Sequence, residues 1–468
     1  MTADELLAQG SALRREGNFS AAIRLLDQAA RLSPADPEIW LERGYVFDFG
    51  GSLDNALKSY AESARLGGGA AALAGYASVA VRKGDYAGAR EAAQLALDLA
   101  PGEPTATIAL ARCDIEARAF ADAEARLNSL LIRDDVASEE RMIAGGLLGD
   151  VLDKLDRPAE AFASYTRSKA LFTEVHAERF AGQPPLTHFV EEIGKTFASV
   201  SAEGWIAEAG PIDGAPHNHV FLLGYPRSGT TLVENILASA PGVAALEERP
   251  TLREADREFL DPPSKLVALS ELDQEGLQPW REAYWQRVRA GGVAPEMQTF
   301  VDMDPLKGSR LPMIARLFPA AKIVAMRRDP RDVVLSCFRT SFAPTAAAYQ
   351  FTTLDGVARH YDALMRLQQT CLAALPLAYH ELYYERLVGD FDTTTRDLCG
   401  FLDIPWSKEL RRFDKTAEAR GVSTASQTQV RRGLYDGRAQ WRKYETELAP
   451  VMPILQPWIE EFGYAGTP

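Results

Sequence analysis

A short loop after an apolar stretch has the composition of an anion-binding site. Residues 224–232 read GYPRSGTTL and directly follow the apolar residues VFLL. Gly224 and Gly229 flank four residues, which is the glycine spacing of a P-loop, G-x-x-x-x-G-K-[ST]. Thr230 stands where a P-loop has the lysine that reaches the β- and γ-phosphates. The spacing therefore predicts anion binding, whereas the missing lysine argues against a kinase or NTPase.

The residues around this loop predict a strand, a turn and a helix. HVFLLGY has the composition of a buried strand, and TTLVENILAS has helical spacing. The N–H groups at a helix N-terminus attract anions, and Arg227 adds a forked donor. A tight turn without a ligand is the alternative interpretation. The predicted anion site consists of Arg227, Ser228, Gly229, Thr230 and Thr231.

Strand and helix patterns alternate from residue 219 onward. The further strand candidates are TFVDM, AKIVAMR and LPLAYHELYYE, and SRLPMIARLF has helical spacing. This alternation predicts a P-loop-like α/β domain with a central parallel sheet over residues 219–468.

Residues 219–465 resemble a sulfotransferase that uses 3′-phosphoadenosine 5′-phosphosulfate (PAPS). They are most similar to the tyrosylprotein sulfotransferases and to bacterial proteins that join tetratricopeptide repeats to such a domain. In that family PRSGTTL binds the 5′-phosphosulfate. The resemblance implies PAPS as donor, adenosine 3′,5′-bisphosphate as product and no required metal. Sulfuryl transfer moves a less highly charged group than the γ-phosphate, so a loop that bridges Mg²⁺ is dispensable.

The resemblance extends to RRDPRDVVLS, residues 327–336. The family's binding site for the 3′-phosphate maps to Arg328 and Ser336. An arginine at a strand end and a serine two helical turns later can converge on one phosphate. Arg327 and Arg331 are expected to face solvent. Two anion motifs about a hundred residues apart fit a nucleotide with a phosphate at each end.

The resemblance also assigns a catalytic base within ALEERP, residues 245–250. The family's catalytic glutamate maps to Glu248, and Glu247 is the adjacent alternative. A positioned carboxylate can take the proton of an acceptor hydroxyl as the hydroxyl attacks sulfur. The alternative is that these charged residues are only exposed to solvent and have no catalytic role. Small-molecule sulfotransferases use a histidine instead, and none of the six histidines occupies that position.

The chain departs from the family in VDMDPLKG, residues 301–308. The family commonly has a lysine just before the Asp-Pro pair, where it reaches the bridging oxygen of the leaving group. Met303 stands there, and methionine cannot stabilise developing charge. Lys307 is the candidate replacement, with Arg227 and backbone donors as the other option. The departure leaves open a weakly active or inactive domain.

Two further segments resemble parts of the family's nucleotide site. YYERLVGD, residues 383–390, resembles a strand-end motif whose tyrosine lies near the nucleotide, and Tyr384 is the match. An aromatic core role is the alternative. Residues 426–444 resemble a late loop that closes over the 3′-phosphate and adenine, with Trp441 packed behind it. The candidate ligands there are Arg431, Arg432 and Arg438.

The N-terminal part contains a repeat with a period close to 34 residues. The stretches GNFSAA, GSLDNA, GDYAGA, RAFADA and DRPAEA align. Their small residues fall in register at Ala22, Ala56, Ala89, Ala123 and Ala161, and at Gly10, Gly44, Ala77, Ala111 and Gly149. This pattern resembles the tetratricopeptide repeat. It implies an α-solenoid of helical hairpins, whose concave groove suits an extended peptide or protein partner.

The predicted organisation is a repeat array at 1–175, a helical linker at 176–218 and a transferase domain at 219–468. His217 and His219, at the end of the linker, are expected to be exposed to solvent and to bind no metal. The net charge of −14 argues against a protein that coats nucleic acid. The sequence shows no signal peptide and no membrane span. The four scattered cysteines read as reduced thiols without a metal site, which favours a cytoplasmic location.

These features favour a PAPS-dependent sulfotransferase whose acceptor is chosen partly by the repeats. The alternative is a repeat-based interaction scaffold whose transferase domain binds nucleotide but turns over weakly or not at all. Met303 is the residue that keeps this alternative open.

Overall fold

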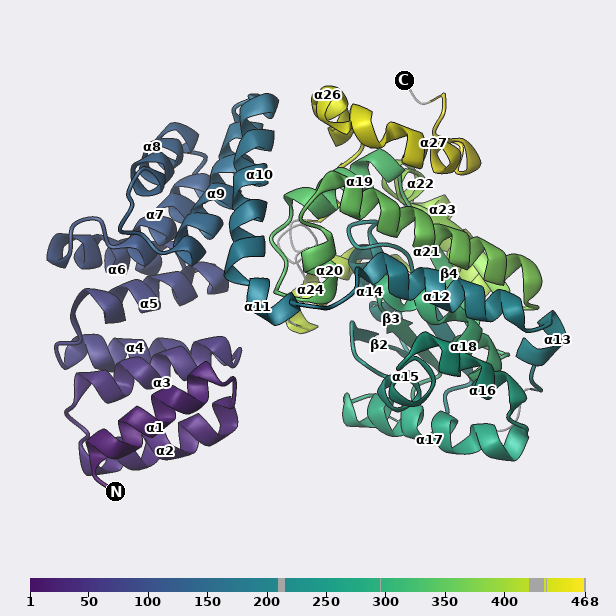
Figure 1. Ribbon diagram of the computed structural model, residues 1–468, viewed down its shortest axis with the longest axis horizontal. Helices are drawn as coiled ribbons and strands as arrows, with labels where there is room; N and C mark the ends of the chain where they lie inside the picture. The colour runs from purple at the N-terminus through teal and green to yellow at the C-terminus, as the bar shows by residue number, and fades with distance from the viewer. Residues whose placement is uncertain (209–214, 295, 421–432, 435, 467–468) are drawn as a thin grey trace. The chain divides into compact units, whose positions relative to one another are not determined.

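A computed structural model describes residues 1–208, 215–294, 296–420, 433–434 and 436–466. The chain forms two compact units, Met1–His176 and Ala177–Pro468 (Figure 1). Among the helices of the described ranges, none combines the length and apolarity that a bilayer span requires.

The first unit is an array of helices that pair in sequence order, α1 with α2 through α9 with α10. The helices are α1 Ala3–Arg15, α2 Phe19–Leu32, α3 Pro37–Phe49, α4 Leu53–Arg65, α5 Gly69–Lys83, α6 Tyr86–Leu99, α7 Pro104–Glu116, α8 Phe120–Leu131, α9 Ser138–Lys154 and α10 Pro158–Val175. This architecture confirms the predicted solenoid of helical hairpins.

The glycines and alanines that recur in register in the repeats lie where the paired helix leaves no room for a larger side chain. A Cβ atom at Gly44 would lie 2.4 Å from the ring of Tyr60. A Cβ atom at Gly149 would lie 2.4 Å from the ring of Tyr165. The aligned alanines at the start of each second helix are fully buried. Larger side chains at these points would push the two helices of a hairpin apart.

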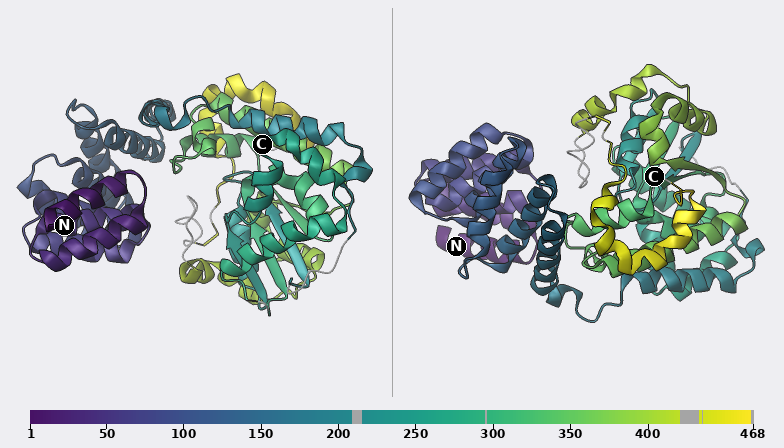
Figure 2. Two further views of the ribbon diagram at one scale, coloured as in Figure 1. Left: turned by 60° about the horizontal axis from the view of Figure 1, so that its bottom comes forward. Right: turned by 90° about the horizontal axis from the view of Figure 1, so that it is seen from above.

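The second unit is built around a parallel sheet with helices on both faces (Figure 2). Among the described residues its strands are β1 Asn218–Leu223, β2 Val243–Glu247, β3 Thr299–Met303, β4 Lys322–Arg327 and β5 Ala378–Tyr383. Their order is β2-β3-β1-β4-β5. Asn218 pairs with Thr299 of β3, and Val220 pairs with Lys322 of β4. The predicted α/β domain with a parallel sheet is confirmed.

The helices around the sheet are mostly short. In chain order the α-helices are α11 Ala177–Phe180, α12 Leu186–Ser199, α13 Ala202–Trp205, α14 Thr230–Ala238, α15 Arg253–Phe259, α16 Leu266–Glu271, α17 Gln274–Ala290, α18 Leu311–Leu317, α19 Pro330–Arg339, α20 Ala346–Gln350, α21 Leu354–Ala374, α22 Tyr384–Gly389, α23 Phe391–Leu402, α24 Phe413–Arg420, α26 Glu445–Leu448 and α27 Met452–Glu461. The 3₁₀ turns are η1 Pro263–Lys265, η2 Pro305–Arg310, η3 Lys408–Arg412, η4 Gln440–Tyr444 and η5 Ala449–Val451.

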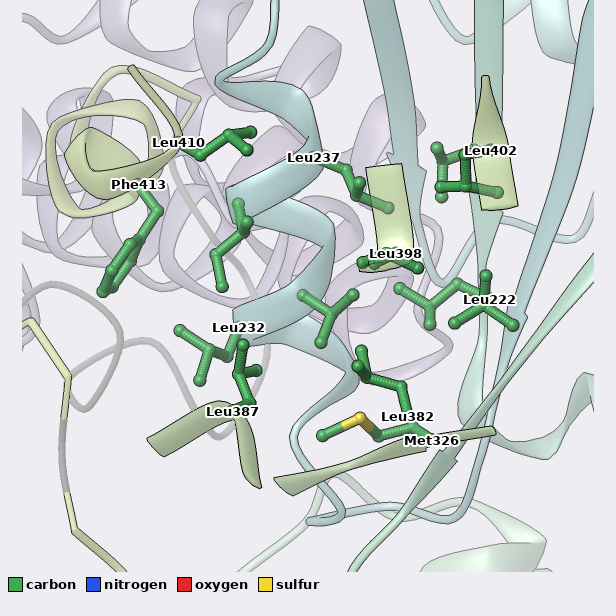
Figure 3. Close-up of a cluster of buried hydrophobic side chains, with 14 of the residues drawn as sticks. Leu222, Leu232, Leu237, Met326, Leu382, Leu387, Leu398, Leu402, Leu410 and Phe413 are labelled. Atoms are coloured by element: carbon green, nitrogen blue, oxygen red, sulfur yellow. The ribbon is translucent and has the colours of Figure 1, made fainter. Parts of the chain in front are cut away.

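One apolar layer fixes α14 on the sheet. Side chains from α14, the strands and α22–α23 meet in this layer (Figure 3). Its labelled members include Leu222, Leu232, Leu237, Met326, Leu382, Leu398 and Leu402. Because α14 starts at the end of the anion loop, this layer also holds the loop in place.

The segment treated as a linker in the sequence analysis packs within the second unit. Helix α12 packs against α21, and Trp205 is fully buried with its indole N–H donating to the Phe197 carbonyl at 3.2 Å. His219 is also no exposed linker residue. It lies in β1, where its Nε2 is 2.7 Å from the Tyr284 hydroxyl. The strand β1 has too few alternating polar and apolar residues for the sequence to show which face His219 occupies.

Candidate active site

The predicted site residues gather at the carboxyl edge of the sheet. Parallel strands end at one edge, so the segments that follow β1 to β5 all emerge there. Strand β1 is flanked by β3 on one side and β4 on the other, and the chain reverses its winding direction at this point. Such a switch point is where open α/β sheets bind ligands.

The anion loop, residues 224–231, is shaped by its two glycines. Gly229 has φ of 108°, and a Cβ atom there would lie 2.9 Å from both Met326 and Tyr384. A Cβ atom at Gly224 would lie 2.7 Å from the Ser228 hydroxyl. That hydroxyl donates to the Tyr225 carbonyl at 2.7 Å. The loop is therefore a tight turn that delivers the chain into α14.

Residues from the two anion motifs meet although they are far apart in sequence. Arg227 donates through Nε to the Ser336 hydroxyl at 3.2 Å. Arg328 donates through Nη1 to the Arg227 carbonyl at 2.8 Å. Burial lowers the pKa of the Arg227 guanidinium, and an anion at this point would offset that cost.

Arg328 sits between the anion loop and the C-terminal segment. Its guanidinium lies 4.7 Å from the ring centre of Tyr384, and Nη2 donates to the Gly437 carbonyl at 2.6 Å. The Nε of Arg328 is buried and has no hydrogen-bond partner among the described residues. A buried N–H without an acceptor is costly. The donor set thus fits an additional anion beside Arg328.

Of the three arginines predicted in the late loop, the structure describes only Arg438. Arg431 and Arg432 lie outside the described residues. Arg438 is exposed and forms an ion pair with Asp436 at 2.7 Å. The Gly437 N–H donates to the Tyr384 hydroxyl at 3.3 Å, so residues 436–438 do reach the site.

Asp332 is a site residue that sequence reasoning missed. Its carboxylate accepts the backbone N–H groups of Ala439 and Trp441, each at 2.8 Å. Burial raises the pKa of Asp332 to about 6, and Arg328 opposes the shift. Asp332 therefore anchors the C-terminal segment beside Arg328. The motif RRDPRDVVLS contains Asp332 and could have pointed to it. Its role could not be predicted, because its partners lie more than a hundred residues away.

Arg327 and Arg331 do not face solvent as expected. Arg327 is buried and donates to Glu381 at 3.0 Å and Gln368 at 3.1 Å. Arg331 is buried, pairs with Asp329 at 2.7 Å and stacks on Trp441 at 3.8 Å. The partners of Arg327 and the ring of Trp441 are distant in sequence, whereas Asp329 lies two residues from Arg331 in the same motif.

Glu248 follows β2 at the same edge. Its N–H donates to the Met303 carbonyl at 2.8 Å, and its φ is 47°. The side chain keeps contact with solvent. Desolvation by the surrounding protein, followed by the negative charges of Asp304, Glu247 and Glu234, raises the pKa of Glu248 to about 7, while Lys307 opposes this shift. A carboxyl group with such a pKa suits a general base at neutral pH.

Lys307, the predicted leaving-group ligand, is engaged in a buried ion pair. Its side chain is 4% exposed, and Nζ donates to Asp302 at 2.5 Å. Nζ also donates to the Thr251 hydroxyl at 3.0 Å and the Arg249 carbonyl at 3.3 Å. An ammonium group has three N–H donors, and these contacts use all of them. Lys307 thus forms a buried ion pair, and these contacts disfavour the predicted role at the leaving group. Met303 is fully buried in β3.

The histidines near the sheet, His219 and His360, are poor candidates for the base. Burial lowers the pKa of His219 to about 3 and that of His360 to about 4. His360 is engaged with the Tyr225 hydroxyl at 2.8 Å. The described residues also hold no group of three or more His, Cys, Asp or Glu side chains placed to bind a metal ion.

Known families match both units. Residues 219–408 match the model of the sulfotransferase family. Residues 7–71, 50–104 and 80–139 match models of the tetratricopeptide repeat.

Curated relatives are similar at low identity. Protein-tyrosine sulfotransferase 1 of Danio rerio is 26% identical over 275 residues, covering 52% of this chain and 72% of that protein. The human protein of the same name is 27% identical over 260 residues, covering 52% of this chain and 69% of that protein. An Aquifex aeolicus protein is 28% identical over 349 residues, and the chain covers only 43% of its length.

Among solved structures, the sulfotransferase domain of the Synechococcus PCC 7002 olefin synthase aligns with 51% of this chain and 98% of that chain, at 20% identity and a TM-score of 0.32. The family models, together with the two compact units, lead to one conclusion. The chain carries a sulfotransferase-family domain preceded by an array of tetratricopeptide repeats.

Proposed function

We propose that the second unit transfers a sulfuryl group from PAPS to an acceptor hydroxyl, and that the repeat array selects a peptide or protein acceptor. The observation that carries this proposal is the meeting of Arg227, Ser336 and Arg328, with the buried Arg328 Nε lacking an acceptor among the described residues. Two anion sites side by side suit a donor with a phosphate at each end. The names of the relatives support a peptide acceptor.

The residues present fit the donor. The anion loop with Arg227 would hold its 5′-phosphosulfate, and Arg328 with Ser336 would hold its 3′-phosphate. Tyr384 would lie against the nucleotide. When bound, PAPS supplies an activated sulfuryl group and adenosine 3′,5′-bisphosphate as the leaving group.

Glu248 then takes the proton of the acceptor hydroxyl. The hydroxyl oxygen forms a bond to sulfur while the bond from sulfur to the 5′-phosphate oxygen breaks. The negative charge that develops on that phosphate oxygen is stabilised by Arg227 and the N–H groups at the start of α14. Because Lys307 is engaged elsewhere, this account assigns it no contact with the leaving group. It also requires no metal ion.

Activity should rise with pH through about pH 7. The deprotonated form of Glu248 is the base, and its pKa lies near 7, so the active fraction is small below this pH and complete above it. The measurement is kcat/KM against pH with the wild-type chain. A profile that is flat between about pH 5 and 9 would contradict a carboxyl base with this pKa.

A fragment of residues 177–468 should keep its affinity for adenosine 3′,5′-bisphosphate within about twofold, because the anion motifs and their supporting helices lie inside that unit. It should lose turnover on a macromolecular acceptor but keep any turnover on a small phenol. Calorimetry and product assays on fragment and full chain test both points. A fragment starting at residue 212 is unsuitable, since it removes α12 and the buried Trp205.

The acceptor can be sought directly. The full chain is incubated with a cell extract and PAPS that carries labelled sulfate, and labelled products are identified by mass spectrometry. The proposal predicts labelled peptides or proteins that are absent with Glu248→Gln. If the chain binds the donor but labels nothing, the scaffold alternative is favoured, for which Met303 and the engaged Lys307 are the supporting observations.

A further inference from the structure

A buried ion pair lies directly behind the segment that carries Glu248. The side chains of Lys307 and Asp302 are 4% and 0% exposed, and Nζ is 2.5 Å from Oδ1. Desolvating two charges costs much of what their attraction returns, so a buried pair is weak evidence for a role in stability. Its position suggests a different use.

The Lys307–Asp302 pair is hydrogen-bonded to the residues that directly follow Glu248. Lys307 Nζ donates to the Arg249 carbonyl and the Thr251 hydroxyl, at 3.3 and 3.0 Å. The Thr251 hydroxyl in turn donates to Asp302 Oδ2 at 2.7 Å. Residues 249–251 are thereby tied to the carboxyl end of β3.

Glu248 adopts a backbone conformation that needs such support. A φ of 47° lies in the left-handed region, which residues other than glycine seldom enter. Such a conformation persists when its surroundings hold it. The Met303 carbonyl holds the N–H of Glu248 on one side, and the Lys307–Thr251 bonds hold residues 249–251 on the other.

A third donor completes the coordination of Asp302. The Tyr284 hydroxyl donates to Oδ2 at 2.8 Å, and His219 Nε2 lies 2.7 Å from that hydroxyl. Because the hydroxyl hydrogen points to Asp302, His219 must donate through Nε2, which fixes its tautomer. Asp302 is thus oriented by partners from η2, α17 and the segment after β2, and His219 of β1 contacts one of these partners, Tyr284.

We propose that Lys307, Asp302 and Thr251 are positioning residues that aim the Glu248 carboxylate at the acceptor hydroxyl. The inference rests on the proposed function, in which Glu248 is the base. It gives Lys307 a different task from the lysine that the family has at position 303.

The charges facing Glu248 make the proposal measurable. Asp304, Glu247 and Glu234 raise the pKa of Glu248, whereas Lys307 lowers it. Removing the Lys307 charge should therefore move the rising limb of the pH profile to higher pH. Removing the Thr251 hydroxyl weakens the bonds that fix residues 249–251 but changes no charge. It should therefore lower kcat and leave the rising limb of the pH profile at the same pH.

The experiment compares Thr251→Val, Lys307→Gln and Lys307→Arg in the full chain. Thr251→Val should lower kcat about tenfold with KM for PAPS unchanged. Lys307→Gln should lower kcat and shift the limb to higher pH, and Lys307→Arg should restore the wild-type limb. Thr395→Val is the matched control: Thr395 is buried and bonded to Phe391 and Trp406, remote in sequence from this segment, and the variant should keep wild-type kcat.

The outcomes separate this inference from the proposed function. If Glu248→Gln stays active, the assigned base and this inference both fail. If Glu248→Gln is inactive while Thr251→Val and Lys307→Gln keep the wild-type kcat and pH profile, the positioning role alone is overturned. A rate loss confined to Lys307→Gln, with Thr251→Val at the wild-type kcat, would place the effect on the Lys307 charge and not on the hold on the segment, and it also overturns the positioning role. Should Lys307→Gln unfold, the double variant Asp302→Asn/Lys307→Gln leaves no unpaired buried charge and serves in its place. It should lower kcat, and because one positive and one negative charge are removed together, the limb should move less than in Lys307→Gln.

Discussion

Replacing Glu248 with glutamine is expected to slow the chemical step by about 10²–10⁴-fold, the usual worth of a positioned general base. Glutamine keeps the shape of the side chain but cannot take a proton from the acceptor. The affinity for adenosine 3′,5′-bisphosphate should stay within about twofold, since no proposed nucleotide contact is lost. Single-turnover rates and calorimetry measure the two quantities.

Glu247→Gln is the matched control, because the change is chemically identical one residue away. Glu247 ends β2, and its Oε1 is buried, whereas Glu248 keeps contact with solvent. The Glu247 variant should therefore lose much less activity. If it is the inactive one, the base is Glu247. If neither variant slows a measurable turnover, the carboxylate mechanism fails.

Replacing Arg328 with alanine should weaken the binding of adenosine 3′,5′-bisphosphate by about 2–3 kcal/mol, as expected for a lost charge-assisted bond. Its Nε lacks an acceptor among the described residues, while Tyr384 and the Arg227 and Gly437 carbonyls hold the guanidinium in place. The affinity for adenosine 5′-phosphate should hardly change, because that nucleotide has no 3′-phosphate. Calorimetry with both nucleotides gives the comparison.

Ser336→Ala provides a graded control for Arg328→Ala. It removes one neutral donor and should cost about 0.5–1.5 kcal/mol, again with the bisphosphate alone. Because Arg328 also bonds the Arg227 carbonyl, its loss could disturb the anion loop instead. Equal losses for both nucleotides would reveal this indirect effect and refute the assignment of the 3′-phosphate to Arg328.

The sequence predicted those parts of the fold that depend on local pattern. TFVDM became β3 Thr299–Met303, and AKIVAMR contains β4 Lys322–Arg327. Short, mostly apolar runs of this length are typical of buried parallel strands. The repeat register was equally readable, because each hairpin needs a small residue where a neighbouring side chain, such as Tyr60 or Tyr165, fills the space.

The errors concern charged residues whose partners could not be identified from the sequence. Arg327 was expected in solvent, yet its partners Gln368 and Glu381 come from α21 and β5. Lys307 was expected at the leaving group, yet Asp302 and Thr251 take its donors. A positive charge in a motif shows that a partner is needed. Only the fold determines whether that partner is a ligand or a buried carboxylate.

The prediction that residues 176–218 form a linker was wrong for a similar reason. Its helical piece and its Pro- and Gly-containing connector are typical of a linker, but α12 packs on α21 and Trp205 is buried. The apolar face of an isolated helix does not identify the surface that covers it. His219 was misplaced because a single polar residue at the start of β1 carries no information about its neighbours Tyr284 and Trp285.

The most direct test of the central claim is calorimetric titration of the full chain with adenosine 3′,5′-bisphosphate in the presence of a metal chelator, beside a titration with ATP and Mg²⁺. This measurement does not depend on knowing the acceptor. A PAPS site should bind the bisphosphate without metal, and should bind ATP with Mg²⁺ at least about tenfold more weakly. A preference for ATP with Mg²⁺, or bisphosphate binding that requires metal, would contradict a PAPS-dependent sulfotransferase site.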